Sequence, residues 1–305
     1  MILVFAGGVG AAKFLEGLVQ VVPPEEIVAV VNTGDDFVLH GLMIAPDLDI
    51  VTCTLADLID REQGWGIAGD TTACMEWLGK LGAPQWFKLG DRDLALHIQR
   101  TALLREGWTL SHVADHLRQA LGVKVRIVPM SNDPAPTHIV TAAGEMHFER
   151  YFVERRAQDD VQDVRLHAAG PAQPTPELLD LIAQADHILL APSNPIVSIG
   201  PILALPGVRR ALQTTAVPIV AISPIVGGAA IKGPAAPLMR AMGYEVSAFG
   251  IAQIYADLID TLVIDQLDQA LMNSIKALGL QVVVTDTIMR DSAAKARLAT
   301  VALQG

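Results

Sequence analysis

Six short runs of apolar, mostly β-branched residues recur along the chain, and stretches of helical character separate them. Each run is apolar at almost every position, whereas a strand with one wet face would alternate apolar and polar residues. Strands of this kind are buried on both faces, which is typical of a parallel sheet covered by helices. The pattern predicts a Rossmann-like, doubly wound α/β fold with a mainly parallel sheet. The expected strands are residues 2–6, 27–32, 187–192, 218–223, 261–265 and 280–286.

The middle of the chain breaks this alternation. Residues 71–122 have a helical pattern, including one helix that Thr109 can cap and Gly122 can close. The segments "KVRIVPM" and "THIVTAAGEMHFERYFV" then have strand character, and the second is expected to be a hairpin that turns at Ala143 and Gly144. We therefore expect a Rossmann-like core from residues 1–60 and 166–305. The insertion at 61–165 would be helical first and then a small antiparallel sheet.

Charge and hydropathy exclude several classes of protein. The net charge of −11 argues against a nucleic-acid partner, because phosphate neutralisation needs a basic surface. No apolar run reaches the roughly 18 residues of a membrane helix, and the start "MILVFAGG" lacks the features of a signal peptide. A cytoplasmic protein without a membrane partner is expected. The two cysteines, Cys53 and Cys74, are too few for a disulfide framework and are expected to be buried apolar fillers.

The first strand runs directly into a glycine-rich turn, "VFAGGVGAAKF" at residues 4–14. A turn that opens a helix exposes unpaired amides to an anion, and Gly7, Gly8 and Gly10 allow close approach of a ligand. The spacing is G-x-G-x-x-K, which ends in Lys13 and matches neither the dinucleotide fingerprint nor the P-loop. By itself the turn fits a phosphate site, and it also fits a tight strand-to-helix connection with Lys13 on the surface.

The second strand ends in Asn32, where a dinucleotide-binding fold would place an acidic residue for the ribose. This weakens the case for a nicotinamide cofactor. Acidic residues follow instead, at Asp35 and Asp36 in the next loop and at Asp47 and Asp49 where a helical stripe begins. First-turn carboxylates also occur for helix-dipole reasons alone. Together, beside a phosphate site, they predict a magnesium site.

Seven segments, in order, resemble the 2-phospho-L-lactate transferase family of coenzyme F(420) biosynthesis. The resemblance extends from residue 1 to about residue 290. The segments are "GGVGAAK", "NTGDDFVLHGLMIAPDLD", "WGIAGDT", "KLGDRDLALHIQRT", "PMSNDP", "LAPSNPIVSIGPIL" and "ISPIVGGAAIKGPA". A similar but more distant group of uncharacterised proteins shares the glycine turn, so that turn alone does not decide between the two groups.

The resemblance implies a reaction. Family members transfer a phospholactyl group, or in some bacteria a phosphoenolpyruvyl group, from a guanosine diphosphate conjugate to the ribityl hydroxyl of 7,8-didemethyl-8-hydroxy-5-deazariboflavin, and GMP leaves. Magnesium is the usual requirement, for which Asp36, Asp47 and Asp49 are the expected ligands. The aspartate and lysine that bind the deazaflavin in the family match Asp49 and Lys88, and Asp49 is also the expected catalytic residue. A homodimer is the default assembly.

The later matched segments suit the nucleotide half of the donor. Ser193 and Asn194 follow one expected strand, and Gly227, Gly228 and Lys232 follow the next, so both loops lie at the ligand-binding edge of the sheet. Gly7, Gly8, Gly10, Lys13 and Asn32 complete the predicted donor site.

Other interpretations stay open at this point. "SNDP" is equally a turn or a wall of the active site, and the roles of Arg92 and His97 do not follow from the sequence. Two other functions are a nicotinamide-dependent oxidoreductase and a non-catalytic nucleotide-binding regulator of the same fold.

Overall fold

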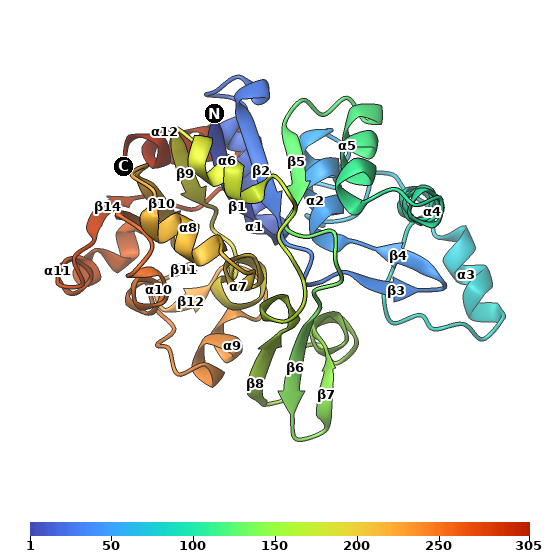
Figure 1. The fold of residues 1–305 in the computed structure, drawn as a ribbon. Helices are drawn as coiled ribbons and strands as arrows, with labels where there is room; N and C mark the ends of the chain where they lie inside the picture. The colour runs from blue at the N-terminus through green and yellow to red at the C-terminus, as the bar shows by residue number, and fades with distance from the viewer.

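A seven-stranded sheet crosses the centre of the molecule in the computed structural model, which describes residues 1–305 (Figure 1). All of its strand pairs are parallel. The strands, in spatial order, are β14 (Gln281–Thr285), β13 (Thr261–Asp265), β10 (Ile219–Ile222), β9 (His187–Leu190), β1 (Ile2–Ala6), β2 (Ile27–Val31) and β5 (Arg126–Pro129). This confirms the predicted doubly wound, Rossmann-like α/β fold.

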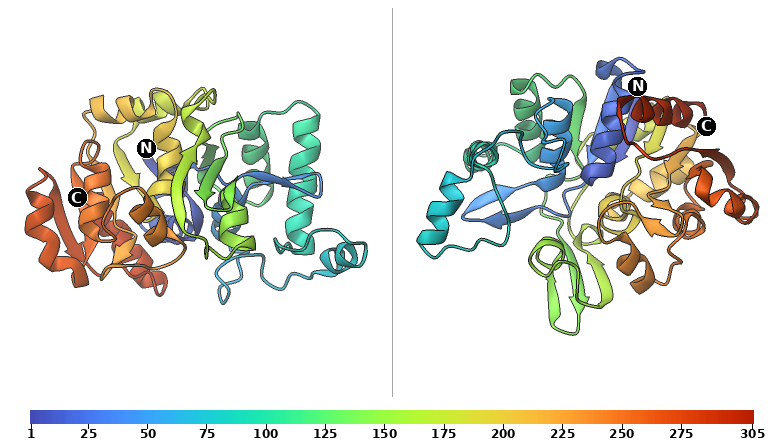
Figure 2. Two further views of the ribbon diagram at one scale, coloured as in Figure 1. Left: turned by 90° about the horizontal axis from the view of Figure 1, so that it is seen from below. Right: turned by 180° about the vertical axis from the view of Figure 1, so that it is seen from behind.

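Helices cover both faces of the sheet, which explains why its inner strands are apolar at almost every position. Every residue of β1, β2, β10 and β13 is buried. One face packs on α1 (Gly8–Leu18), α2 (Pro46–Leu55) and α12 (Ser292–Gln304). The other packs on α6 (Leu178–Gln184), α7 (Gly200–Ala204), α8 (Val208–Thr214), α9 (Ala235–Ala241), α10 (Ala248–Tyr255) and α11 (Met272–Lys276). The view from behind in Figure 2 shows α1 and α12 together on their face.

The strand order reverses between β1 and β9. From β1 the chain proceeds through β2 to β5 at one edge, and from β9 through β10 and β13 to β14 at the other. In open α/β sheets such a reversal leaves a crevice beyond the carboxyl ends of the two strands, where ligands bind. The glycine turn after β1 and the "APSNP" loop after β9 therefore flank the position that topology favours for a ligand.

Outside the central sheet lie two small substructures. The first combines the hairpin β3 (Phe37–Leu39) and β4 (Leu42–Ile44) with α3 (Ala73–Lys80), α4 (Asp91–Arg105) and α5 (Leu110–Ala120). The second is an antiparallel sheet of β6 (Thr137–Thr141), β7 (Gly144–His147) and β8 (Val161–Leu166), which projects below the central sheet in Figure 1. A further short hairpin consists of two strands of two residues each, β11 (Ile225–Val226) and β12 (Ala229–Ala230).

Three details differ from the sequence-based expectations. Strand β5, expected in the insertion at 61–165, pairs in parallel with β2 as an edge strand of the central sheet. Ala142 and Ala143 form the loop of the β6–β7 hairpin, one residue earlier than expected. Cys53 is buried as expected, whereas Cys74 is exposed because it lies on the outer side of α3. The division into core and insertion stays a prediction.

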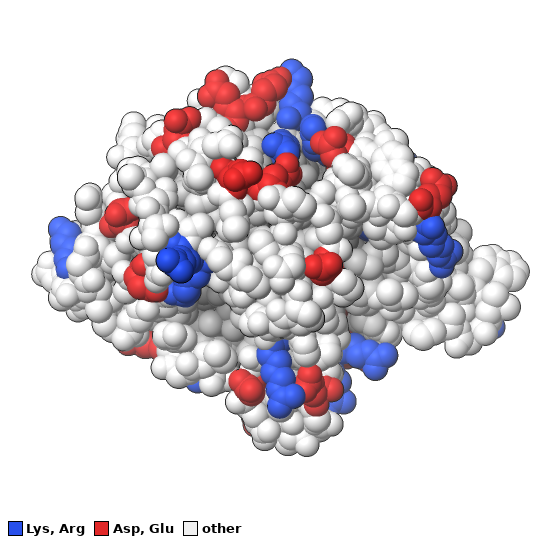
Figure 3. Space-filling model, in the orientation of Figure 1, with Lys and Arg blue, Asp and Glu red and all other residues white.

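None of the helices is long and apolar enough to cross a membrane. The face of the molecule in Figure 3 carries acidic and basic side chains in mixed groups, without a large basic patch.

Candidate active site

The turn after β1 and the loop after β9 are tied together at the topological reversal. The hydroxyl of Ser193 donates to the carbonyl oxygen of Gly7 at 2.8 Å and accepts from the Gly7 amide at 3.3 Å. A Cβ at Gly10 would overlap the carbonyl oxygen of Pro192. Gly7 and Gly10 are therefore required for close packing between the two segments, and Ser193 serves as a bridge between them.

The amino terminus of α1 is occupied by a carboxylate of the chain itself. Gly8, with a φ of +68°, donates its amide to Oδ1 of Asp47 at 2.8 Å. A carboxylate at this position benefits from the helix dipole as a phosphate would. The glycine turn thus holds Asp47 in place, and the two amides of Gly7 and Gly8 already have partners within the protein.

Asn32 connects the acidic loops. Its Nδ2 donates to Oδ2 of Asp47 at 2.9 Å and lies 3.2 Å from both Oδ1 of Asp35 and the carbonyl oxygen of Val197. Its Oδ1 accepts from the amide of Gly34 at 2.8 Å. Asn32, placed by the sequence in the donor site, therefore organises the carboxylates from the end of β2.

Four carboxyl groups are buried near one another, and burial is the main cause of their perturbed pKa values. Burial raises the pKa of Asp47 to about 6, against the hydrogen bonds from Asn32 and Gly8. Burial and the charge of Asp47 raise the pKa of Glu149 to about 8. Burial also raises the pKa of Asp35, with contributions from Asp47 and Glu149. The same cause raises the pKa of Asp36, although Arg100 opposes it. Such a cluster favours a bound cation.

Asp36 is the member of this cluster that best fits a metal ligand. Both of its carboxylate oxygens are buried without a hydrogen-bond partner, and Asp49 has one such oxygen, Oδ2. Orphaned carboxylate oxygens beside other acidic groups suit magnesium, which binds through one or two carboxylates plus substrate and water. The three expected ligands Asp36, Asp47 and Asp49 do not converge as a ready-made set, because the one cluster with three ligand atoms within 4.8 Å lies elsewhere.

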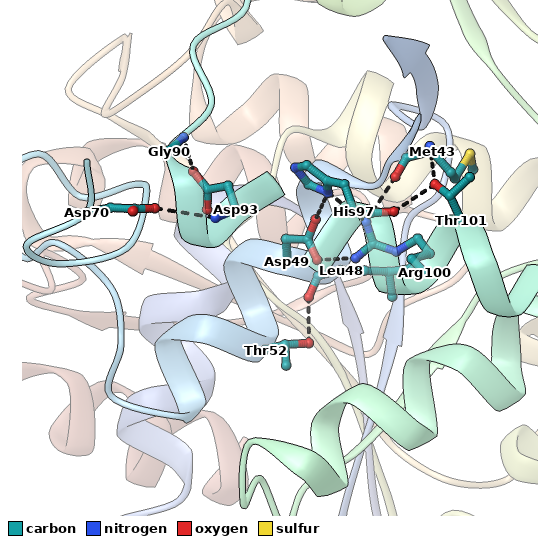
Figure 4. Close-up of polar contacts among 10 residues, drawn as sticks. All are labelled: Met43, Leu48, Asp49, Thr52, Asp70, Gly90, Asp93, His97, Arg100 and Thr101. Carbon is teal, nitrogen blue, oxygen red and sulfur yellow. Dashed lines mark hydrogen bonds and ion pairs between the residues drawn. The ribbon is translucent and has the colours of Figure 1, made fainter. Parts of the chain in front are cut away.

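Asp49, in the first turn of α2, lies against two residues of α4 (Figure 4). Its Oδ1 pairs with the buried guanidinium of Arg100, and its Oδ2 lies 3.5 Å from Nδ1 of His97. Arg100 also donates to the carbonyl oxygen of Met43 at 3.2 Å. The ion pair with Arg100 fixes the carboxylate at the carboxyl edge of the sheet.

His97 is neutral at physiological pH. Burial lowers the pKa of His97 to about 4, despite the attraction of Asp49. Its Nδ1 lies 3.0 Å from a guanidinium nitrogen of Arg100, and a guanidinium can only donate. The ring proton therefore resides on Nε2, which is buried without a partner. His97 thus has one donor available for a ligand.

Lys88 is exposed and forms no ion pair or hydrogen bond with the protein. The residues just before it, Trp86 and Phe87, pack on Phe37 with ring centroids 5.4 and 5.0 Å apart. Since Phe37 directly follows Asp36, this aromatic contact ties the Lys88 segment to the acidic loop. The structure therefore brings the segments of Lys88 and Asp36 together and leaves the ammonium group free.

The neighbouring residues of the "KLGDRD" segment have structural roles. Asp91 accepts from the amide of Cys74 at 2.9 Å and so holds the start of α3. Asp93 accepts from the Gly90 amide at 3.0 Å and so satisfies a backbone donor at the start of α4. Arg92 is exposed, and its guanidinium donates to the carbonyl oxygen of Ala68 at 3.1 Å.

In "SNDP", the side chain of Asn132 accepts from Ser111 and that of Asp133 accepts from the Gln173 amide, so both side chains bind distant segments of the chain.

The later loops are only partly free for a donor. Asn194 caps the following turn, with its Oδ1 3.0 Å from the Ile196 amide. The amide of Gly227 donates to the carboxylate of Asp268, and Gly228 is exposed. Lys232 forms no ion pair, and neither does Lys13. The main cause of the lowered pKa of Lys232 is desolvation, with a second contribution from the ammonium of Lys13.

Two residues of the site were missed by sequence reasoning. Arg100 lies on the buried side of α4, three residues after His97. A basic residue on the inner side of a helix indicates a buried acidic partner or ligand, and this signal could have identified Arg100. Glu149 follows β7 and is separated from Asp47 by about a third of the chain. Nothing in its local sequence indicates that it joins the cluster.

Comparison with known proteins places this arrangement in a family. Residues 2–303 match the family model described as "2-phospho-L-lactate transferase CofD". The 2-phospho-L-lactate transferase of Methanosarcina mazei is 41% identical, over 99% of each chain. That of Methanothermobacter thermautotrophicus is 44% identical, over 99% of this chain and 97% of the relative. The phosphoenolpyruvate transferase of Streptomyces griseus is 42% identical, over 99% of this chain and 97% of its own.

A solved structure shares the fold at much lower identity. It is a member of the UPF0052 family from Bacillus halodurans, with a TM-score of 0.65, 18% identity and coverage of 99% of this chain and 98% of the other. At this identity the likeness concerns the fold alone.

Proposed function

This chain belongs to the 2-phospho-L-lactate transferase family, and from that membership we propose that it makes the phosphodiester precursor of coenzyme F(420). In the proposed reaction, a phospholactyl or phosphoenolpyruvyl group passes from a diphospho-5'-guanosine donor to the ribityl hydroxyl of 7,8-didemethyl-8-hydroxy-5-deazariboflavin. The hydroxyl oxygen attacks the phosphorus that bears the lactyl or enolpyruvyl group. The bridging P–O bond breaks, and GMP leaves.

One observation carries the proposal beyond membership in the family. Asp49 and Asp36, whose charges influence each other, both keep unpartnered carboxylate oxygens at the carboxyl edge of the sheet. A hydroxyl acceptor needs such an oxygen to hold it in line with the phosphorus. The free Oδ2 of Asp49 is suited to that role, because Arg100 fixes the other oxygen of the same carboxylate. We assign Asp49 to orient the ribityl hydroxyl and to accept its proton.

Lys88 is proposed to be the second residue, beside Asp49, that binds the deazaflavin. Its ammonium is unpaired, and the aromatic contact of its segment with Phe37 keeps it near the acidic loop. The neutral His97 offers its Nε2 proton to an oxygen of the substrate.

The donor's diphosphate is proposed to lie toward Lys13 and Lys232. The Lys232 ammonium is near Gly64, since a Cβ there would be 3.3 Å from Nζ. Gly64 and Lys13 line the same cavity of about 210 Å³. Two ammonium groups that lie close together without an acidic partner repel each other, and a diphosphate between them would remove that repulsion.

Magnesium fits the acidic cluster through the free oxygens of Asp36, with Asp47 and Asp49 beside it. When bound, the ion would neutralise charge on the diphosphate. Without it, Asp47 and Asp36 would repel an anionic donor.

The test is release of GMP, followed by chromatography, with donor, deazaflavin and magnesium present. We expect GMP only when both substrates are present, complete loss in excess EDTA with an unchanged circular dichroism spectrum, and recovery on adding magnesium. Full activity in EDTA would refute the metal assignment. Absence of GMP with every donor would refute the proposed transfer.

A further inference from the structure

The small antiparallel sheet carries a cluster of possible metal ligands that the proposed transfer does not use. His138 comes from β6, Glu145 from β7, and His167 directly follows β8. One ligand atom from each of these three residues lies within 4.8 Å of the other two. We call these residues the trio, and no other group of three in the chain meets this distance. Oε1 of Glu145 is 2.8 Å from Nδ1 of His138 and 3.7 Å from Nε2 of His167.

The strand register explains this convergence. His138 lies opposite His147 on β7 and opposite Arg165 on β8. Residues two apart on one strand share a face, so Glu145 and His167 fall on the same side of the sheet as His138. The opposite side, which includes Ile139, packs into the core. The three side chains therefore converge because side chains alternate between the two faces of the sheet, and no distortion of the backbone is required.

The charges around Glu145 leave one oxygen for a shared ligand. Its Oε2 pairs with the guanidinium of Arg165, whereas its Oε1 faces both imidazoles. The rings of His138 and His167 meet edge to face at a centroid distance of 4.7 Å. A hydrogen bond to His138 occupies Oε1, and a cation that coordinates both residues would replace that bond.

His147 lies beside this trio but belongs to the acidic site. Its Nε2 is 3.2 Å from the carbonyl oxygen of Asp36, and its Nδ1 accepts from the Glu149 amide at 3.2 Å. Both ring nitrogens are therefore engaged. The trio is thus a three-ligand set with a fourth position open to solvent or to a ligand.

We propose that His138, Glu145 and His167 bind a zinc ion. Two imidazoles and one carboxylate are ligands that zinc accepts in tetrahedral sites with an open position, whereas magnesium prefers oxygen ligands. The ion would join all three strands of the small sheet. The proposal is independent of the transferase reaction, because none of the three residues is assigned to either substrate.

The test is metal binding by the full chain after removal of metals with a chelator. We expect one equivalent of zinc in competition with a chromophoric chelator, and one equivalent of cobalt with the visible absorption of a four-coordinate site. We also expect zinc to raise the melting temperature, since it binds only the folded state. His138→Asn, His167→Asn and Glu145→Gln should each weaken zinc binding by a factor on the order of 10 or more and abolish the shift in melting temperature.

A matched control uses another pair of histidines, His112 and His116. They lie one turn apart on the exposed side of α5, a spacing at which two histidines could also bind a metal ion. The double variant His112→Asn/His116→Asn should bind zinc as the unaltered chain does. The proposal is overturned if the stripped chain takes up neither ion, or if the three single variants bind zinc as tightly as the unaltered chain does. Circular dichroism identifies any variant that unfolds, and the remaining two then decide.

Discussion

Asp49 lies on the first turn of a helix, where a carboxylate is favourable for the helix dipole alone, yet its contacts extend beyond its own helix. Arg100 and His97 approach it from α4, and Oδ2 has no hydrogen-bond partner. A helix-start residue would not need a buried guanidinium from another element. The contacts therefore favour a functional role for the side chain.

We expect Asp49→Asn to lower kcat by a factor on the order of 100 to 10,000 with saturating deazaflavin. The amide keeps the shape of the side chain but cannot accept the hydroxyl proton or balance Arg100. Steady-state kinetics of GMP release measure the change.

Lys88→Ala is the matched variant on the acceptor side. An exposed cation that touches a remote part of the acceptor contributes similar binding in the ground and transition states. The KM for deazaflavin should rise while kcat changes little.

A turnover of Asp49→Asn near that of the unaltered enzyme would contradict the catalytic assignment and return Asp49 to the role of a helix-start residue.

Glu149 gives a prediction about stability and pH. The pKa of its carboxyl is raised from 4.5 to about 8 in the folded chain. Between these values the unfolded chain releases a proton that the folded chain retains, so stability falls as the pH rises through this window. Glu149→Gln has no proton to lose. Its advantage over the unaltered chain should therefore grow from pH 5 to pH 8, to a few kcal/mol, at about 1.4 kcal/mol per pKa unit.

Urea unfolding in metal-free buffer measures this difference, with the exposed Glu106→Gln as control. The control should follow the unaltered chain at every pH. A constant gap between Glu149→Gln and the unaltered chain over the same range would show that Glu149 is not buried with its proton.

At the scale of elements, the connection between the β1 turn and the β9 loop fixes the geometry of the site. Gly10 lies against the carbonyl oxygen of Pro192, and Ser193 bonds to both backbone groups of Gly7. Gly10→Ala should destabilise the fold by about 1–3 kcal/mol, because the overlap with backbone outweighs the better helix propensity of alanine.

Gly79→Ala is the matched control within a helix. A Cβ there would meet the end of the Gln85 side chain at 3.1 Å, and that side chain can move. This variant should be as stable as the unaltered chain or slightly more so. Equal stability of the Gly10 and Gly79 variants in urea would mean that the two loops are not closely docked.

Elements of the fold were predictable where one local signal decides. Strands such as β1 and β2 are apolar throughout. Thr109 caps α5 as its position predicts, with its side chain accepting from the His112 amide. The position of β5 was not predictable, since pairing with β2 depends on a neighbour about 100 residues away. The same holds for the bond between Gly8 and Asp47 and for Glu149, whose partners come from distant segments.

At the scale of the whole molecule, the strand reversal gathers residues from the whole length of the chain at one edge of the sheet. The β1 turn, the acidic loop, the start of α2 and the β9 loop meet there, and α4 and the small sheet contribute Arg100 and Glu149. The match to the family over residues 2–303 covers all these segments. The candidate site is therefore a property of the full fold.

The most direct test of the proposed transfer is the mass spectrum of the deazaflavin product formed with phospholactyl, phosphoenolpyruvyl and phosphoglyceryl donors in turn. The account predicts a product heavier by the phospholactyl or phosphoenolpyruvyl group, with one GMP released for each product molecule. Attack at the other phosphorus would instead attach a guanylyl group and release phospholactate or phosphoenolpyruvate. A guanylylated deazaflavin, or unchanged deazaflavin with all three donors, would contradict the account.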